Sequence, residues 1–144
     1  MATERYAEVT WQGSLLEGSG TIERVGSGAF GPLDVTWTSR AERPDEHTSP
    51  EELIAAAHAA CFSMALSHEL AGAGSAPERL ATSATVTFVA GTGITKIALA
   101  VRGRVPGFDE DGFRRAAEAA KDACPVSQAL AGVGEIAVAA TLEA

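Results

Sequence analysis

Residues 49–66 read Ser-Pro-Glu-Glu-Leu-Ile-Ala-Ala-Ala-His-Ala-Ala-Cys-Phe-Ser-Met-Ala-Leu, and they predict a helix that is apolar on nearly every side. Ser49 is a suitable N-cap, the proline after it suits a first turn, and Glu51 and Glu52 lie near the positive end of the helix dipole. We expect the helix to run to about Leu70, where glycines follow. A helix of this composition must be buried over most of its surface.

The composition is that of a small acidic globular protein. The chain has 144 residues, which fits a single domain spanning residues 1–144, and 46% of them are apolar, enough for a core. The net charge is −8 and no basic cluster occurs, so we expect no nucleic acid and no membrane as partners. The longest apolar run is shorter than the roughly 20 residues of a membrane span, and no signal peptide is evident. We expect a cytoplasmic protein.

Alternating and β-branched segments predict strands on both sides of the helix. The predicted strands are residues 4–11, 18–24, 33–41, 80–90, 94–104 and 135–142. A second helix is predicted over residues 109–123, and a further helical turn over residues 126–131. Because no βαβ repeat is evident, we predict an α+β fold with antiparallel sheets.

Cys61, in the middle of the apolar helix, is the first candidate for a reactive residue. An apolar site disfavours the thiolate, so Cys61 is either a core residue or a residue ionised by a charge from elsewhere. The second cysteine, Cys124, precedes Pro125, where the unpaired N–H groups of a new helical turn can lower the pKa of a thiol. In an intracellular protein we expect no static disulfide, which leaves a redox pair, a metal pair or two core thiols.

Helix geometry limits how these candidates can meet. Ten residues separate Glu51 from Cys61, which is about 15 Å along one helix axis. If both are catalytic, a second copy of the helix must run antiparallel and bring its own Glu51 near Cys61. We therefore predict a C2 homodimer with sites at the interface. Arg40, at the end of the predicted strand 33–41 and on one face with two threonines, is the candidate cation.

A metal site is the weaker interpretation of the same region. His58 lies one turn before Cys61, and these two residues with Cys124 could ligate a metal ion. The set lacks a fourth ligand at any recognisable spacing, so we expect no metal.

The helix 49–66 and the segment Cys-Pro-Val-Ser-Gln at 124–128 resemble the OsmC/Ohr family of osmotically inducible and organic-hydroperoxide-resistance proteins. Val-Thr-Trp-Gln-Gly at 9–13, Thr-Ser-Arg at 38–40 and Ile-Thr-Lys-Ile-Ala-Leu at 94–99 agree, so the resemblance covers essentially the whole chain. The OsmC branch fits better, because the arginine comes directly before the helix rather than in the first hairpin.

The resemblance implies an intertwined homodimer in which sheets wrap around two central helices. It implies a thiol-dependent peroxidase of organic hydroperoxides in which Cys61 resembles the peroxidatic cysteine and Cys124 the resolving one. Arg40 resembles the thiolate-activating arginine, and Glu51 the glutamate that orients it. No cofactor is implied, and the expected reductant is a dithiol such as a dihydrolipoyl group. The alternatives are a redox sensor or small-molecule binding protein without catalysis on the same fold, or a structural dimer with inert thiols.

Overall fold

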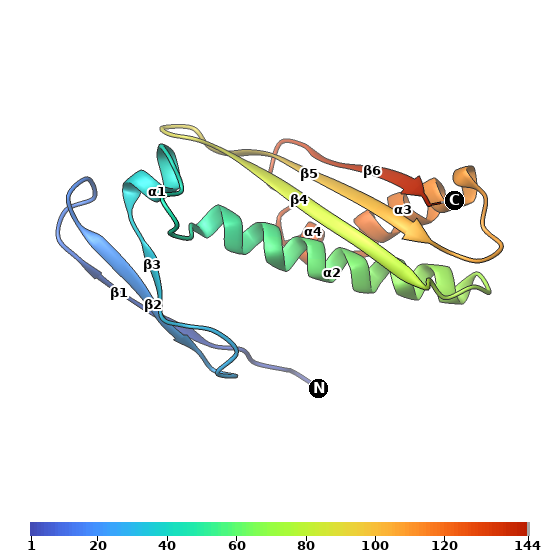
Figure 1. Ribbon diagram of the computed structural model, residues 1–144, viewed down its shortest axis with the longest axis horizontal. Helices are drawn as coiled ribbons and strands as arrows, with labels where there is room; N and C mark the ends of the chain where they lie inside the picture. Colours follow the sequence, from blue (N-terminus) through green and yellow to red (C-terminus); the bar gives the residue numbers. More distant parts are fainter. Residues whose placement is uncertain (144) are drawn as a thin grey trace. The chain divides into compact units, whose positions relative to one another are not determined.

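The computed structural model describes residues 1–143, and the chain divides into two compact units, residues 1–53 and the part from Ile54 onward (Figure 1). The helices and strands, in chain order, are β1 (Ala7–Gln12), β2 (Ser19–Val25), β3 (Leu33–Val35), α1 (Trp37–Ala41), α2 (Pro50–Gly72), β4 (Arg79–Val89), β5 (Gly93–Arg104), α3 (Glu110–Ala123), α4 (Pro125–Ala129) and β6 (Ile136–Leu142).

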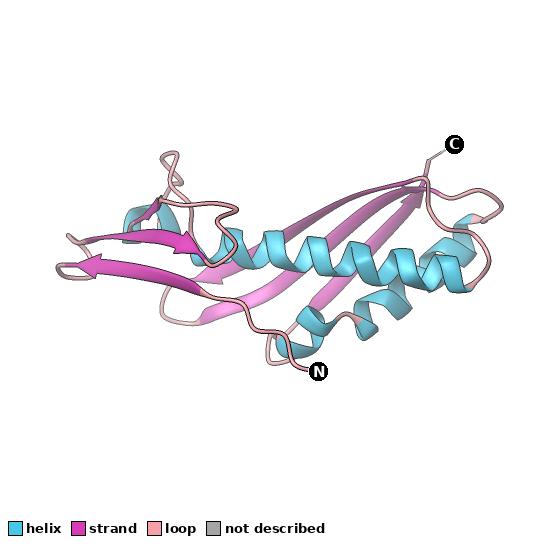
Figure 2. Cartoon of the chain, turned by 90° about the horizontal axis from the view of Figure 1, so that it is seen from below, coloured by secondary structure: helices cyan, strands magenta, loops and turns pink. Residues whose placement is uncertain are grey.

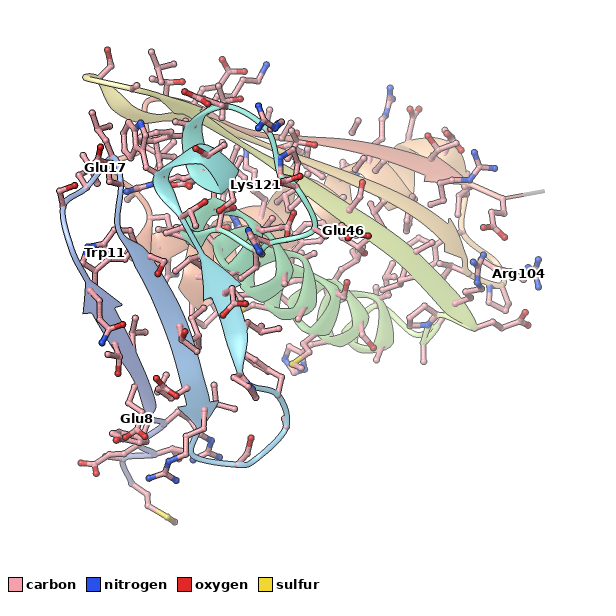
Figure 3. The ribbon with its side chains drawn as sticks, turned by 60° about the vertical axis from the view of Figure 1, so that its left-hand side comes forward. Glu8, Trp11, Glu17, Glu46, Arg104 and Lys121 are labelled. Atoms are coloured by element: carbon pink, nitrogen blue, oxygen red, sulfur yellow. The ribbon has the colours of Figure 1, made fainter. Side chains whose placement is uncertain are left out.

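The first unit contains a three-stranded antiparallel sheet in the order β1-β2-β3. Within it Ile22 on β2 is buried, whereas Val9 and Trp11 on β1 are 59% and 41% exposed. Figure 3 labels Trp11 on this strand. The sheet therefore leaves large apolar side chains of its first strand exposed within the single chain.

The segment 33–41 departs from the prediction of one long strand, which is wrong beyond Val35. Strand β3 ends there, and α1 follows. Thr36 caps this helix: its hydroxyl accepts from the N–H of Ser39 at 3.0 Å, and the Ser39 hydroxyl accepts from the N–H of Thr36 at 3.0 Å. Reciprocal capping of this kind satisfies two backbone donors and outweighs the strand preference of the β-branched and aromatic residues. Arg40 consequently lies in the last turn of a short helix.

Helix α2 begins and ends close to the predicted residues. The Ser49 hydroxyl accepts from the N–H of Glu52 at 3.1 Å, which confirms Ser49 as the N-cap. Phe62, Leu66 and Leu70 are fully buried, but Met64 is 72% exposed. The prediction that most of this helix is buried is therefore wrong for the single chain.

Helix α2 is also long and apolar enough to cross a membrane by length and composition alone. Core helices of soluble proteins meet the same criteria, so this is a weak indication.

The second unit contains the sheet β4-β5-β6, in which β4 and β5 pair antiparallel as predicted. Strands β5 and β6 pair parallel, so the prediction of purely antiparallel sheets is wrong for this pair. Helices α3 and α4 lie between these two strands in the chain and provide the crossover that a parallel pair requires. Figures 1 and 2 show α2 and α3 on the same face of this sheet.

The core of the second unit lies between the sheet β4-β5-β6 and the helices α2 and α3. Alternate residues of β5, Ile97, Leu99 and Val101, are buried as the twofold period of a strand requires. Leu99 and Val101 belong to one apolar cluster with Phe62, Leu66 and Leu70 of α2 and with Phe113, Ala117 and Ala120 of α3. Cys124 is a buried member of this cluster, so the core fixes its position at the end of α3.

Candidate functional site

The second unit brings Cys61 and Cys124 together. Cys61 lies on α2 and is partly buried, whereas Cys124 is fully buried where α3 ends and α4 begins. The two thiols are close enough for each to shift the pKa of the other, and neither is in a disulfide. Two thiols in this arrangement can form a disulfide after oxidation of one of them.

The surroundings make the two thiols unequal. Burial has the largest effect and raises the pKa of Cys61. The Val126 N–H lowers it in part, and the Cys124 thiol raises it further. Burial would also raise the pKa of Cys124. The Ser127 N–H, the Cys61 thiol, the Ser127 hydroxyl and the Val126 N–H together lower that pKa below its ordinary value. The N–H groups belong to the first turn of α4, as predicted for a cysteine before Pro125. Within one chain, nothing described makes Cys61 the more acidic thiol.

The first unit brings Arg40 and Glu51 together. The Arg40 Nε donates to both Glu51 carboxylate oxygens at 3.1 Å, and Nη2 donates to Oε2 at 2.9 Å. The Glu51 side chain is 8% exposed and that of Arg40 is 34% exposed. Several hydrogen bonds from a guanidinium to one carboxylate fix its orientation. Arg40 is thereby held in place while part of it stays accessible.

A hollow of about 370 Å³ adjoins this ion pair. Its lining residues are Trp11, Leu15, Val35, Thr36, Trp37, Arg40 and Pro50. Arg40 is the one charged residue among them, so the hollow suits an apolar group that carries one polar end. A larger hollow of about 730 Å³ between α3 and β6 contains none of the four predicted site residues.

His58 is fully buried on α2, and its Nε2 lies 2.7 Å from the Ser127 hydroxyl. Burial lowers the pKa of His58, so its imidazole is neutral near pH 7. Ser127 did not stand out in the sequence, although it belongs to the segment 124–128 and lies three residues after Cys124. Among residues 1–143 no group of three acidic, histidine or cysteine side chains is placed to hold a metal ion.

Comparison with known proteins decides the family. A family model of OsmC-like proteins matches residues 43–138. "Peroxiredoxin OsmC" of Escherichia coli (strain K12) is 42% identical over 133 residues, which are 90% of this chain and 92% of the relative. The chain belongs to the OsmC family. This confirms the predicted family and makes the chain a thiol-dependent peroxidase, an oxidoreductase. This activity disfavours the two alternatives, a redox sensor or binding protein without catalysis and a structural dimer with inert thiols.

Solved structures of related proteins share the fold. The organic hydroperoxide resistance protein OhrB of Bacillus subtilis is 25% identical, with a TM-score of 0.64 over 96% of this chain and 98% of that one. An OsmC-like protein from Mycoplasma pneumoniae is 18% identical, with a TM-score of 0.68 over 96% and 98% of the two chains. The second likeness concerns the fold alone. The predicted α+β class with sheets and a long helix is confirmed.

Proposed function

We propose that this OsmC-family protein reduces organic hydroperoxides to alcohols, with the Cys61 thiolate as the nucleophile. The observation that carries this proposal is Arg40, which a buried Glu51 holds at the edge of an apolar hollow. A guanidinium is the group that can both stabilise a thiolate and bind a polarised peroxide oxygen. The apolar lining of the hollow favours an alkyl substituent over the small hydrogen peroxide molecule.

Arg40 and Glu51 act on a cysteine of a second copy in this proposal. Glu51 and Cys61 are ten residues apart on α2, or about 15 Å along its axis, so the ion pair serves the partner's Cys61 rather than its own. A homodimer also accounts for apolar side chains that the single chain leaves exposed, among them Val9, Trp11 and Met64. The guanidinium then reverses the effect of burial on the pKa of Cys61.

The reaction follows from these roles. The Cys61 thiolate attacks the outer oxygen of the hydroperoxide, an S–O bond forms, and the O–O bond breaks. The alkoxide leaves, takes a proton from water and becomes the alcohol, while Cys61 is oxidised to the sulfenic acid. Arg40 donates hydrogen bonds to the peroxide, and it stabilises the charge that develops on the leaving oxygen.

Cys124 completes the cycle. Its sulfur attacks the Cys61 sulfur, a disulfide forms, and the departing hydroxide takes up a proton to become water. A dithiol reductant, for which a dihydrolipoyl group is our expectation, reduces the disulfide by two exchange steps and is itself oxidised. The proposed cycle needs no metal, haem or flavin, and we expect it to run in the cytoplasm.

Turnover assays with the two cysteine variants test the proposal. Cys61→Ser should abolish reduction of an alkyl hydroperoxide, whereas Cys124→Ser should consume one equivalent and then stall as the sulfenic acid. The wild type should turn over faster with an alkyl hydroperoxide than with hydrogen peroxide, and faster with a dithiol than with a monothiol at equal thiol concentration. Wild-type activity in Cys61→Ser would overturn the mechanism.

A further inference from the structure

One buried polar contact in the second unit has no role in the cycle described so far. His58 on α2 and Ser127 on α4 come from segments 69 residues apart, and Nε2 and Oγ lie 2.7 Å from each other in the core. Ser127 is 8% exposed and is the third residue of α4, the helix that follows Cys124. The Ser127 hydroxyl is also close enough to the Cys124 sulfur to lower the pKa of that thiol. The His58 imidazole, the Ser127 hydroxyl and the Cys124 sulfur thus form one row of neighbouring polar groups.

The other ring nitrogen of His58 decides which group donates in the contact between His58 and Ser127. His58 Nδ1 is buried and makes no hydrogen bond to any of residues 1–143. A neutral imidazole carries one N–H, and an unpaired buried donor costs more than an unpaired weak acceptor. The proton therefore sits on Nε2, which donates to the Ser127 oxygen. The Ser127 hydroxyl proton is then left to donate to the Cys124 sulfur.

We propose that His58 is a positioning residue for the resolving step: its Nε2–H holds the Ser127 hydroxyl so that the hydroxyl donates to Cys124 and stabilises the Cys124 thiolate. The inference rests on the proposed function, in which Cys124 attacks oxidised Cys61. His58 touches no reacting atom and stays neutral throughout.

The contact between Ser127 and Cys124 favours both the formation and the reduction of the disulfide. Cys124 loses its proton to solvent before it attacks, the S–S bond then forms, and the S–O bond of Cys61 breaks to release hydroxide. When the reductant later attacks the Cys61 sulfur, Cys124 leaves as a thiolate, and the same hydroxyl stabilises it. Without His58 the hydroxyl is free to turn away, and both steps lose the stabilisation of the thiolate.

Other charged groups near Cys124 do not substitute for this contact. Cys61 is the titratable group that faces Cys124 directly. Lys121, close to Cys124 in the chain, lies 4.0 Å from Asp122 and 2.9 Å from Glu118, so it is paired along α3.

A thiol titration tests the inference without any peroxide. In a Cys61→Ser background Cys124 is the only thiol, and its ionisation can be followed by thiolate absorbance near 240 nm against the double variant without cysteines. His58→Gln places an amide N–H where Nε2 was, so the titration midpoint of Cys124 should stay within about 0.3 pH units of the parent. The shorter side chain of His58→Asn cannot reach Ser127. His58→Asn and Ser127→Ala should both raise the midpoint by about one pH unit, a tenfold loss of thiolate below the midpoint. The control is His68→Asn, because His68 is an exposed histidine on the same helix.

Single-turnover oxidation of the variants with Cys61 intact provides a second readout. One equivalent of an alkyl hydroperoxide should oxidise Cys61 at the parent rate in His58→Asn, while disulfide formation slows about tenfold and a sulfenic acid probe traps more protein. Unchanged titration midpoints and unchanged disulfide rates in His58→Asn would overturn the inference. If Cys61 of the parent itself fails to react with the hydroperoxide, the proposed function falls instead, and the thiol titration still decides the role of His58.

Discussion

Replacing Arg40 with glutamine should slow the oxidation of Cys61 by an alkyl hydroperoxide, most strongly near neutral pH. The variant keeps a polar side chain and removes the positive charge that Glu51 holds in place at 2.9 Å. In the proposed dimer this charge is what lets the partner's Cys61 ionise.

The size of the effect follows from the thiolate fraction. An unperturbed cysteine with a pKa of about 8.5 is only about 3% thiolate at pH 7. Burial and Cys124 raise the pKa of Cys61, so within its own chain the thiolate fraction of Cys61 at pH 7 is smaller still. A neighbouring opposite charge shifts a pKa by about 1–3 units, and each unit changes the thiolate fraction by up to about tenfold while the pH lies below the pKa. Arg40→Gln should therefore slow the reaction at pH 7 about tenfold or more.

Rapid mixing with an excess of hydroperoxide, followed over pH 6–9.5, measures this effect. In the proposed dimer Arg40 lowers the pKa of the partner's Cys61, so the rate constant of the wild type should level off at a lower pH than that of Arg40→Gln. Without it the rate constant should climb about tenfold per pH unit up to the raised pKa, so the difference between the two proteins should shrink as the pH rises.

The matched control is Arg24→Gln, which removes an arginine paired with Glu8 on the exposed surface of the first unit. This control should keep the wild-type rate and pH profile. If Arg40→Gln slows the reaction by one constant factor at every pH, Arg40 does not set the ionisation of Cys61, and the reasoning is refuted.

Two further predictions concern the fold that positions the site. Gly103→Ala should lower the free energy of unfolding by about 1–3 kcal/mol, because a Cβ there would lie 2.5 Å from the Phe113 ring; Gly132→Ala, which meets no atom within 4 Å, should change it little in the same urea titration. Thr36→Val should cost about 1 kcal/mol in that assay by removing the hydroxyl that caps α1, and a stability equal to the wild type would contradict the capping contact with Ser39.

Local signals predicted much of this fold. The N-cap at Ser49 and the strand pair β4–β5 follow from residues adjacent in the chain, and both are observed. Helix α1 was missed because the strand preference of its residues hid the capping pair of Thr36 and Ser39. The parallel pairing of β5 with β6 was missed because it joins segments separated by two helices, and a single crossover leaves no repeat to detect.

The candidate site was predictable in its parts and less so in its contacts. The residue types and their local context indicated the two cysteines and made Arg40 the candidate cation. The resemblance gave Arg40 and Glu51 their expected roles, and the structure pairs these two residues. The link between His58 and Ser127 could not be predicted, because it depends on how α4 packs against α2. His58 was considered only as a metal ligand, since a lone buried histidine carries no sign of its partner in the sequence.

The most direct measurement of the central claim is complementation between two inactive copies. Cys61→Ser and Arg40→Gln chains with different affinity tags are co-expressed, and the mixed dimer is isolated by both tags. If each site takes its cysteine from one copy and its arginine from the other, the mixed dimer has one intact site of two, and it should recover about half of the wild-type peroxidase rate at pH 7. If Arg40 serves the cysteine of its own chain, the mixed dimer has no intact site, and activity no higher than the average of the two parents would contradict the account.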